Sequence, residues 1–349
     1  LRTESEEVPA FSTEGGSSST PITFGFADKL APRVGAAYDI FGDGKWKVYG
    51  SWGIFYDIFK MELPRGSFGG DKWLEYYYTL DTYDWTSLTN GASCPPACPG
   101  TLLQTVDFRH SSVDAIDPDM KPYRQQEAVF GFEHQLTNRI ALQARYVHKQ
   151  LDRGVDDIGQ LDASGNEIYS IGNPGYGQSE LFLPDGGTTA ITLPKAQRDY
   201  DAVEVAVNRM LADNWSLRAS YQWSRLYGNY TGLSQGDENG RTSPNVGRAY
   251  DYPLIMFAQD GEPVLGPLPT DRPHQFKAQA IYVLPFGTAI GLNQYVASGI
   301  PITREAAVYP SSQFPVQYLG RGSDGRTDVL SQTDLYVQHE FKAFGDRRI

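Results

Sequence analysis

Residues 214–230 read NWSLRASYQWSRLYGNY, and large apolar side chains occupy every second position. One parity holds Trp215, Leu217, Ala219, Tyr221 and Trp223, and the other holds Ser216, Arg218, Ser220, Gln222 and Ser224. A period of two predicts a β-strand. Aromatic residues at both ends of the apolar series, opposite a fully polar series, are typical of a strand with lipid on one side and water on the other. The first series is therefore predicted to face lipid.

The same pattern recurs along the chain. Phe276 and Tyr282 belong to another apolar series and are also predicted to face lipid. Strands are expected in pairs joined by short turns at residues 42–44, 137–138, 212–214 and 287–288. Nine main strands are predicted, separated by long segments at about 59–121, 154–195, 232–271 and 301–331. Short turns at one end and long loops at the other are typical of outer-membrane barrels.

The predicted fold class is therefore all-β, a transmembrane antiparallel up-and-down β-barrel. Residues 1–30 are expected to precede the first strand, and residues 31–349 to form barrel wall with its long extracellular loops. Nine is an odd number, whereas single-chain bacterial barrels close with an even number of strands. The sequence therefore predicts an incomplete portion of a larger barrel.

The composition and the absence of known motifs narrow the range of possible functions. The 349 residues carry 30 basic and 42 acidic side chains, a net charge of −12, which argues against a nucleic-acid partner. The five histidines lack metal-ligand spacing, and no nucleophile-elbow or phosphate-loop motif occurs. We therefore expect no enzymatic activity, no metal and no cofactor. No apolar run is long enough for a membrane-spanning helix.

Two features of the segment 59–121 suggest local sites. Cys94 and Cys98 flank Pro-Pro-Ala in a predicted extracellular loop, and the cell exterior is oxidising, so a disulfide is expected. Aromatic residues of the same loop could contact a ligand, although an extension of the aromatic girdle or packing between loops explains them too and is the favoured interpretation. The candidates are Trp73, Tyr77, Tyr83 and Trp85.

One stretch carries a family resemblance. Residues 26–35 read FADKLAPRVG, followed by YDIFGDGK at 38–45, Tyr49-Gly50 and Phe55-Tyr56-Asp57. This stretch resembles the C-terminal part of the β-barrel of TonB-dependent outer-membrane receptors of the Oar-like type. The resemblance implies a barrel of about 22 strands in the bacterial outer membrane. It also implies a plug and a TonB-box peptide, neither of which is recognisable in this sequence.

Three functional hypotheses follow. The first is a transporter that imports a bulky solute with energy supplied through the TonB system, with outer-membrane lipid around it. The second is an adhesion or scaffold protein, or a passive pore, that presents long surface loops. The third is a secreted β-sandwich or propeller with no membrane role. The solute could be a siderophore, an oligopeptide or an oligosaccharide, and no motif distinguishes among them.

Overall fold

The computed structural model describes most of the chain. The described ranges are 2–8, 20–59, 74–79, 83, 100–107, 116–117, 119–161, 167–176, 180–182, 188–190, 193–232, 250, 256–308, 314–317, 319–343 and 347–348. Within these ranges, no helix has the length and the apolar character needed to cross a bilayer.

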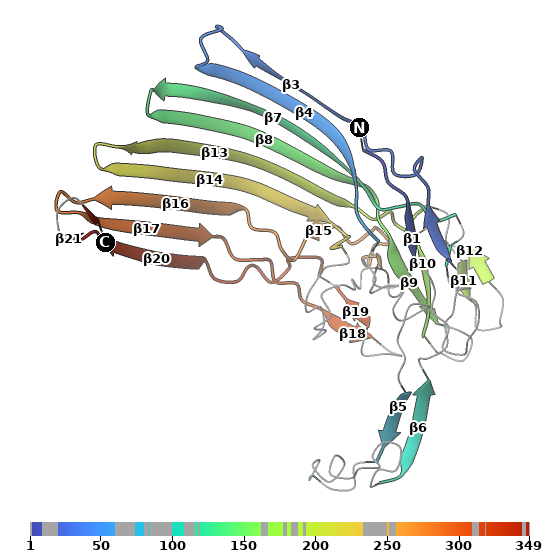
Figure 1. The fold of residues 1–349 in the computed structure, drawn as a ribbon. Helices are drawn as coiled ribbons and strands as arrows, with labels where there is room; N and C mark the ends of the chain where they lie inside the picture. Colours follow the sequence, from blue (N-terminus) through green and yellow to red (C-terminus); the bar gives the residue numbers. More distant parts are fainter. Residues whose placement is uncertain are drawn as a thin grey trace.

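Nine long strands form one antiparallel sheet in which each strand pairs with the next one along the chain (Figure 1). They are β3 (Arg33–Asp39), β4 (Trp46–Tyr56), β7 (Arg124–Thr137), β8 (Ile140–Arg153), β13 (Arg198–Ala212), β14 (Trp215–Gly228), β16 (His274–Val283), β17 (Thr288–Ala297) and β20 (Leu330–His339). A two-residue strand, β15 (Gly266–Pro267), adds to β14. This up-and-down arrangement confirms the predicted fold class. The edge strands β3 and β20 do not pair with each other, so the sheet is an open section of wall.

The short turns all lie at one end of the sheet and the long connections at the other (Figure 1). The β13–β14 turn shows how local sequence sets this geometry. Ala212 pairs with Trp215, and the two residues between them, Asp213 and Asn214, have φ of 50° and 68°. Asp and Asn tolerate positive φ, and two such residues match the twist of a two-residue hairpin.

The pairing register builds two continuous faces. Trp215 pairs with Tyr282, and Tyr221 pairs with Phe276 on β16 and Val205 on β13. We call the face that holds these side chains the apolar face and the opposite one the polar face. Trp215 and Trp223 are eight residues apart, which is about 27 Å along a strand. This separation is comparable to the apolar band of about 25 Å seen on outer-membrane barrels.

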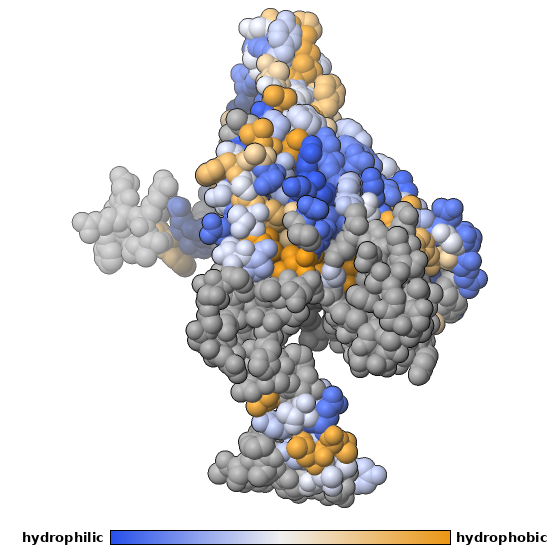
Figure 2. Space-filling model, turned by 90° about the vertical axis from the view of Figure 1, so that its right-hand side faces the viewer, coloured by the Kyte–Doolittle hydropathy of each residue, from blue (hydrophilic) through white to orange (hydrophobic). Residues whose placement is uncertain are grey.

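Figure 2 looks at the molecule from the side that carries the long connections. Hydrophobic side chains lie along one side of the top, where the β3–β4 hairpin lies, and hydrophobic and hydrophilic side chains are interspersed below it.

A glycine on the polar face accommodates a tyrosine from the neighbouring strand. A Cβ atom added to Gly131 on β7 would lie 2.5 Å from Cζ of Tyr49 on β4. The Tyr49 hydroxyl accepts a hydrogen bond of 3.0 Å from Nε2 of Gln143 on β8, so the tyrosine reaches across β7. The absence of a side chain at Gly131 thus allows one aromatic ring to join three strands.

We expect Gly131→Ala to lower the free energy of unfolding by about 1–3 kcal/mol, because the new methyl group must displace the Tyr49 ring. Denaturant unfolding followed by tryptophan fluorescence measures the change. Gly50→Ala is the control, since a Cβ there meets its nearest atom at 3.5 Å, an ordinary contact. Equal stability of the two variants would contradict the proposed role of Gly131.

An arginine on the apolar parity closes the β13–β14 turn. Arg209 is 8% exposed, and its guanidinium lies 3.6 Å from the centroid of the Trp215 ring. The same group donates to the carbonyl oxygens of Ala212 (2.8 Å) and Trp215, and pairs with Asp213 at 3.1 Å. These contacts satisfy the charge of Arg209 at the turn end of the apolar face.

The segments outside the sheet contain short hairpins. Their strands are too short to be recognised by an alternation of apolar and polar residues. Residues 1–30 were expected to precede the first strand, and they hold a two-stranded sheet of their own. The short strands are β1 (Glu6–Val8) with β2 (Ile22–Phe24), β5 (Leu74–Tyr78) with β6 (Leu102–Asp107), β9 (Asp156–Leu161) with β10 (Glu167–Gly172), β11 (Glu180–Phe182) with β12 (Thr188–Ala190), β18 (Ala306–Val308) with β19 (Phe314–Val316), and β21 (Lys342–Ala343) with β22 (Arg347–Arg348).

Two hydrophobic clusters of buried residues lie at the loop end of the sheet. We call the packed segments that contain them the loop layer. The first cluster contains Val8, Ile22, Phe24, Phe59, Met120, Val155 and Ile171. The second contains Leu151, Ile158, Leu193, Ala196, Tyr230, Tyr250 and Met256. Burial raises the pKa of both the Tyr230 and Tyr250 hydroxyls well above the ordinary value, and the Tyr230 hydroxyl donates to the Val155 carbonyl at 2.7 Å.

A buried lysine connects the β1–β2 hairpin to the start of the wall. Lys29 is 1% exposed, and its ammonium group forms an ion pair with the carboxylate of Glu6. The other oxygen of Glu6 accepts the Phe59 backbone N–H at 2.8 Å. The Lys29 ammonium also lies 5.7 Å from the centroid of the Phe24 ring. One ion pair therefore joins β1, the segment before β3 and the segment after β4.

Candidate functional site on the polar face

The polar face carries charged pairs between neighbouring strands. Their nitrogen–oxygen distances are 2.6 Å for Lys47 with Glu133, 2.8 Å for Lys149 with Glu127 and 3.0 Å for Arg145 with Glu204. Opposite charges directly across a sheet stabilise the pairing of strands. In an outer-membrane barrel this face lines the water-filled interior. Most of the charge on β4, β7 and β8 is therefore neutralised within the wall.

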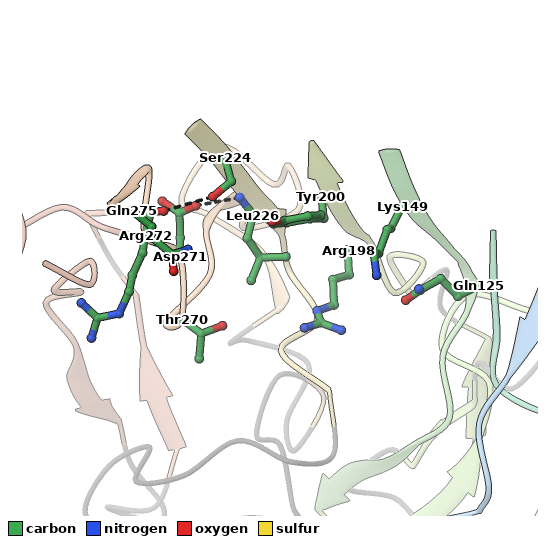
Figure 3. Close-up of a pocket in the computed structure, with 10 residues that line it drawn as sticks. All are labelled: Gln125, Lys149, Arg198, Tyr200, Ser224, Leu226, Thr270, Asp271, Arg272 and Gln275. Atoms are coloured by element: carbon green, nitrogen blue, oxygen red, sulfur yellow. Dashed lines mark hydrogen bonds between the residues drawn. The ribbon is translucent and has the colours of Figure 1, made fainter. Parts of the chain in front are cut away.

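A hollow of about 390 Å³ opens on this face at the loop end of β8, β13 and β14. Figure 3 shows the side chains of Lys149, Arg198 and Tyr200 entering it from neighbouring strands. We call it the rim cavity. Its lining is Gln125, Lys149, Arg198, Tyr200, Ser224, Leu226, Thr270, Asp271, Arg272 and Gln275.

A buried carboxylate fixes one wall of the rim cavity. Asp271 is 3% exposed, accepts the Leu226 backbone N–H at 2.7 Å and pairs with Arg326 at 2.5 Å. Arg326 also donates to the Gly299 carbonyl at 3.1 Å. Because the charge of Asp271 is compensated by Arg326, this carboxylate holds the cavity in shape without making it acidic.

Arg198 lies between the rim cavity and the loop layer. Its Nε atom is buried and has no hydrogen-bond partner among the described residues. Burial raises the pKa of the Tyr123 hydroxyl, and the neighbouring Arg198 guanidinium opposes that rise. A buried guanidinium nitrogen without an acceptor is able to bind an anionic or carbonyl oxygen.

A second hollow of about 350 Å³ lies beside the loop layer, where β8 ends and β13 begins. It includes Asp152, Asp199, Tyr176 and Lys195. The Lys195 ammonium lies 4.4 Å from the centroid of the Tyr176 ring, and Asp152 pairs with Arg124 at 3.0 Å. Asp199 pairs in register with Tyr227, so it belongs to the parity of the apolar face.

The residues predicted to face lipid share one face of the structure. Trp215, Leu217, Ala219, Tyr221 and Trp223 lie on β14, and Phe276 and Tyr282 lie beside them on β16. The loop candidates are not brought together by the described residues. Tyr77, on β5, is 49% exposed and Tyr83 is fully exposed. Trp73, Trp85, Cys94 and Cys98 lie outside the described residues.

Sequence reasoning missed the residues of the rim cavity. Lys149, Arg198 and Arg272 come from three separate segments, and only the register of the strands brings them together. The signal available in the sequence was that residues such as Lys149 and Arg198 occupy the polar parity of their strands. Many other residues occupy that parity too, so the signal does not single out the cavity. Among the described residues, no group of three or more His, Cys, Asp or Glu side chains is arranged to hold a metal ion.

The comparisons with known proteins agree with this architecture. A family model described as an outer membrane beta barrel domain matches residues 5–318. The TonB-dependent transporter Oar of Myxococcus xanthus is 29% identical over 356 residues, which cover 95% of this chain and 31% of that protein. The chain thus spans less than a third of the length of this relative.

Solved outer-membrane transporters also align with the chain. The transporter YddB from Escherichia coli is 12% identical, with a TM-score of 0.49 over 88% of this chain and 34% of that one. The ferric-catecholate import receptor Fiu from E. coli is 12% identical, with a TM-score of 0.42 over 97% of this chain and 34% of that one. Because the family model matches residues 5–318, the chain belongs to the outer membrane β-barrel family, as a stretch of barrel wall in the bacterial outer membrane that is similar to the TonB-dependent transporter Oar.

Proposed function

We propose that the protein containing this chain imports a bulky solute across the outer membrane, with energy coupled through the TonB system. The observation that carries this proposal is the similarity to a TonB-dependent transporter over 95% of the chain. The division into an apolar and a polar face supports it, because a transporter wall must satisfy lipid and water simultaneously. In this proposal the wall and its loops form the path along which the solute crosses the membrane, and no enzymatic step is assigned to them.

The proposal also predicts which face of the sheet contacts lipid and which faces the lumen. Trp215, Leu217, Ala219, Tyr221 and Trp223 on β14, together with Phe276 and Tyr282 on β16, would contact outer-membrane lipid. The rim cavity would open toward the lumen at the loop end, where an arriving solute first meets the wall. Coupling to TonB would involve parts of the protein beyond this chain.

Uptake assays test the function directly. Candidate solutes carrying a radioactive label, drawn from siderophores, oligopeptides and oligosaccharides, are supplied to wild-type cells, to cells lacking this gene and to cells lacking TonB. We expect accumulation of one of these solutes to fall to background in both deletion strains. Accumulation that needs the gene and persists without TonB would instead indicate a passive pore.

A second candidate function is surface adhesion, and the β5–β6 hairpin favours it. The hairpin projects away from the rest of the described structure on the loop side (Figure 1). It exposes Tyr77 and Leu103, which are 49% and 66% accessible. Leu103→Asp separates the two functions, because adhesion through the exposed hairpin would be lost while uptake, for which Leu103 is not a proposed contact, would continue.

Two local proposals accompany the loops. We propose that Cys94 and Cys98 form a disulfide, which intact-mass measurement of the alkylated protein with and without prior reduction detects. We also propose that Trp73, Tyr77, Tyr83 and Trp85 contact the solute. Replacement of these four residues with serine is then expected to weaken uptake at limiting solute concentration, with surface expression unchanged.

A further inference from the structure

On the polar face of the neighbouring strands β13, β14 and β16, three cations lack an acidic partner among the described residues. They are Arg198 on β13, Arg218 on β14 and Lys277 on β16, and we call them the cationic sector. On β4, β7 and β8, by contrast, Lys47, Lys149 and Arg145 each pair with a glutamate at 3.0 Å or less. Arg33 on β3 also lacks an acidic partner within the described ranges, but its guanidinium lies over the Phe55 ring, 4.3 Å from the centroid. The three cations of the sector, by contrast, lie on neighbouring strands of one part of the wall.

Strand register brings two of these cations close together. Lys277 pairs with Ser220, two residues from Arg218 on the same face of β14. Residues in this diagonal relation lie about 7–8 Å apart, and like charges at such distances repel. The neighbouring positions Asn208 and Gln279 supply no negative charge to relieve the repulsion. An anion bound between Arg218 and Lys277 would remove it.

The third cation belongs to the rim cavity. Arg198 pairs in register with Gly228, eight residues above the level of Lys277 along β14. The cavity of about 390 Å³ also receives Lys149 and Arg272 (Figure 3). The buried Nε of Arg198 has no acceptor there. Because the rim cavity lies at the loop end of the sheet, it is the first part of the cationic sector that a solute arriving from outside would reach.

The acidic residues of this part of the wall do not neutralise the sector. Glu204 on β13 pairs with Arg145 at 3.0 Å, and Asp271 at the cavity pairs with Arg326 at 2.5 Å. The whole chain has a net charge of −12, so acidic residues are abundant elsewhere. A local cationic surface within an acidic protein focuses anions onto that surface.

We propose that the cationic sector binds anionic oxygen groups, carboxylate or phosphate, carried by the solute. We call the two anion-binding sites stations. The rim cavity with Arg198 is the first station, and the Arg218–Lys277 pair, which lies deeper in the barrel, is the second. This inference rests on the proposed transport function and adds to it the charge of the solute. Guanidinium groups bind such oxygens through paired N–H donors, and an ammonium group adds a point charge.

Anion binding to the full-length receptor in an uncharged detergent tests the proposal. Citrate and pyrophosphate serve as probes, maltotriose is the neutral comparison, and calorimetry at low salt gives affinity and stoichiometry. The variants are Arg198→Gln for the first station and the double variant Arg218→Gln/Lys277→Gln for the second. Arg225→Gln is the matched control, because Arg225 is on β14 but on the opposite parity, 4.1 Å from the Tyr227 ring.

We expect citrate or pyrophosphate to bind the wild type at two stations and maltotriose not to compete. Each sector variant should weaken one station by about tenfold or more, whereas Arg225→Gln should match the wild type. The proposal is overturned if the wild type binds neither anion, or if the control weakens binding as much as the sector variants.

A different occupant would give a different result. If acidic side chains from another part of the receptor already fill the sector, the sector variants would lower the melting temperature and no added anion would bind. That outcome overturns assignment to the solute. Because binding is measured without TonB, intact anion binding combined with TonB-independent uptake would reject the proposed transport mechanism and leave the cationic sector supported.

Discussion

Ala219→Arg should lower the free energy of unfolding of the barrel by about 2–4 kcal/mol in lipid, because it places a charge where the wall is expected to meet the bilayer centre. Ala219 lies midway between Trp215 and Trp223 on β14 and pairs with Ala278 on β16 and Val207 on β13. No partner of opposite charge is present at these flanking positions. Urea unfolding of the receptor in liposomes, followed by tryptophan fluorescence, gives the value.

The adjacent residue provides the control. Ser220 belongs to the polar face and pairs with Ala206 and Lys277. Ser220→Arg should lower the free energy of unfolding by less than about 1 kcal/mol, since the new side chain stays in water and a like charge directly across a sheet has an effect of about 0.2–1 kcal/mol. Equal losses in the two variants would reject the assignment of the faces.

Lys29→Met should lower the free energy of opening of the β1–β2 hairpin by about 2–4 kcal/mol, because it leaves the largely buried Glu6 carboxylate, whose side chain is 15% exposed, without its counter-charge. Lys29 is 1% exposed, and Glu6 also accepts the Phe59 backbone N–H. Hydrogen exchange of the Phe59 amide reports this opening. Faster exchange is expected at Phe59, with little change in the central strands β8 and β13.

Two variants show whether the ion pair causes the effect. Lys45→Met removes an exposed lysine that is 4.0 Å from Asp43, so its effect on stability should be small. In the double variant Lys29→Met/Glu6→Gln the buried charge is gone, and the amide oxygen of Gln can still accept the Phe59 N–H. Most of the lost protection should return. No difference between the single and double variants would show that packing of the lysine chain, not charge, stabilises the hairpin.

Buried residues of the loop layer illustrate a limit of sequence reasoning. Lys29 lies within FADKLAPRVG, the stretch that carries the family resemblance, yet no pattern in that stretch indicates that its charge is buried. Its partner, Glu6, lies 23 residues earlier in the chain. The strands β1 and β2 are three residues long, too short for alternation to distinguish them from a loop.

The sequence by itself determined the elements of the wall. Alternation along Trp215–Gly228, and along the other long strands, defines each strand and its two faces, because the period of two is a local property of extended backbone. Turn residues such as Asp213 and Asn214 set where hairpins reverse, because few residue types adopt positive φ. Strand number, fold class and the asymmetry between short turns and long connections all follow from such local signals.

Only the tertiary structure decided which polar residues meet. Asp271 and Arg326 are 55 residues apart in sequence, and the rim cavity needs Lys149, Arg198 and Arg272 at one level of the sheet. That level depends on the register of several successive strand pairs, and a slip of one residue in any of them moves every side chain to the other face. The cationic sector and the loop layer are therefore products of non-local pairing, which alternation along a single strand does not encode.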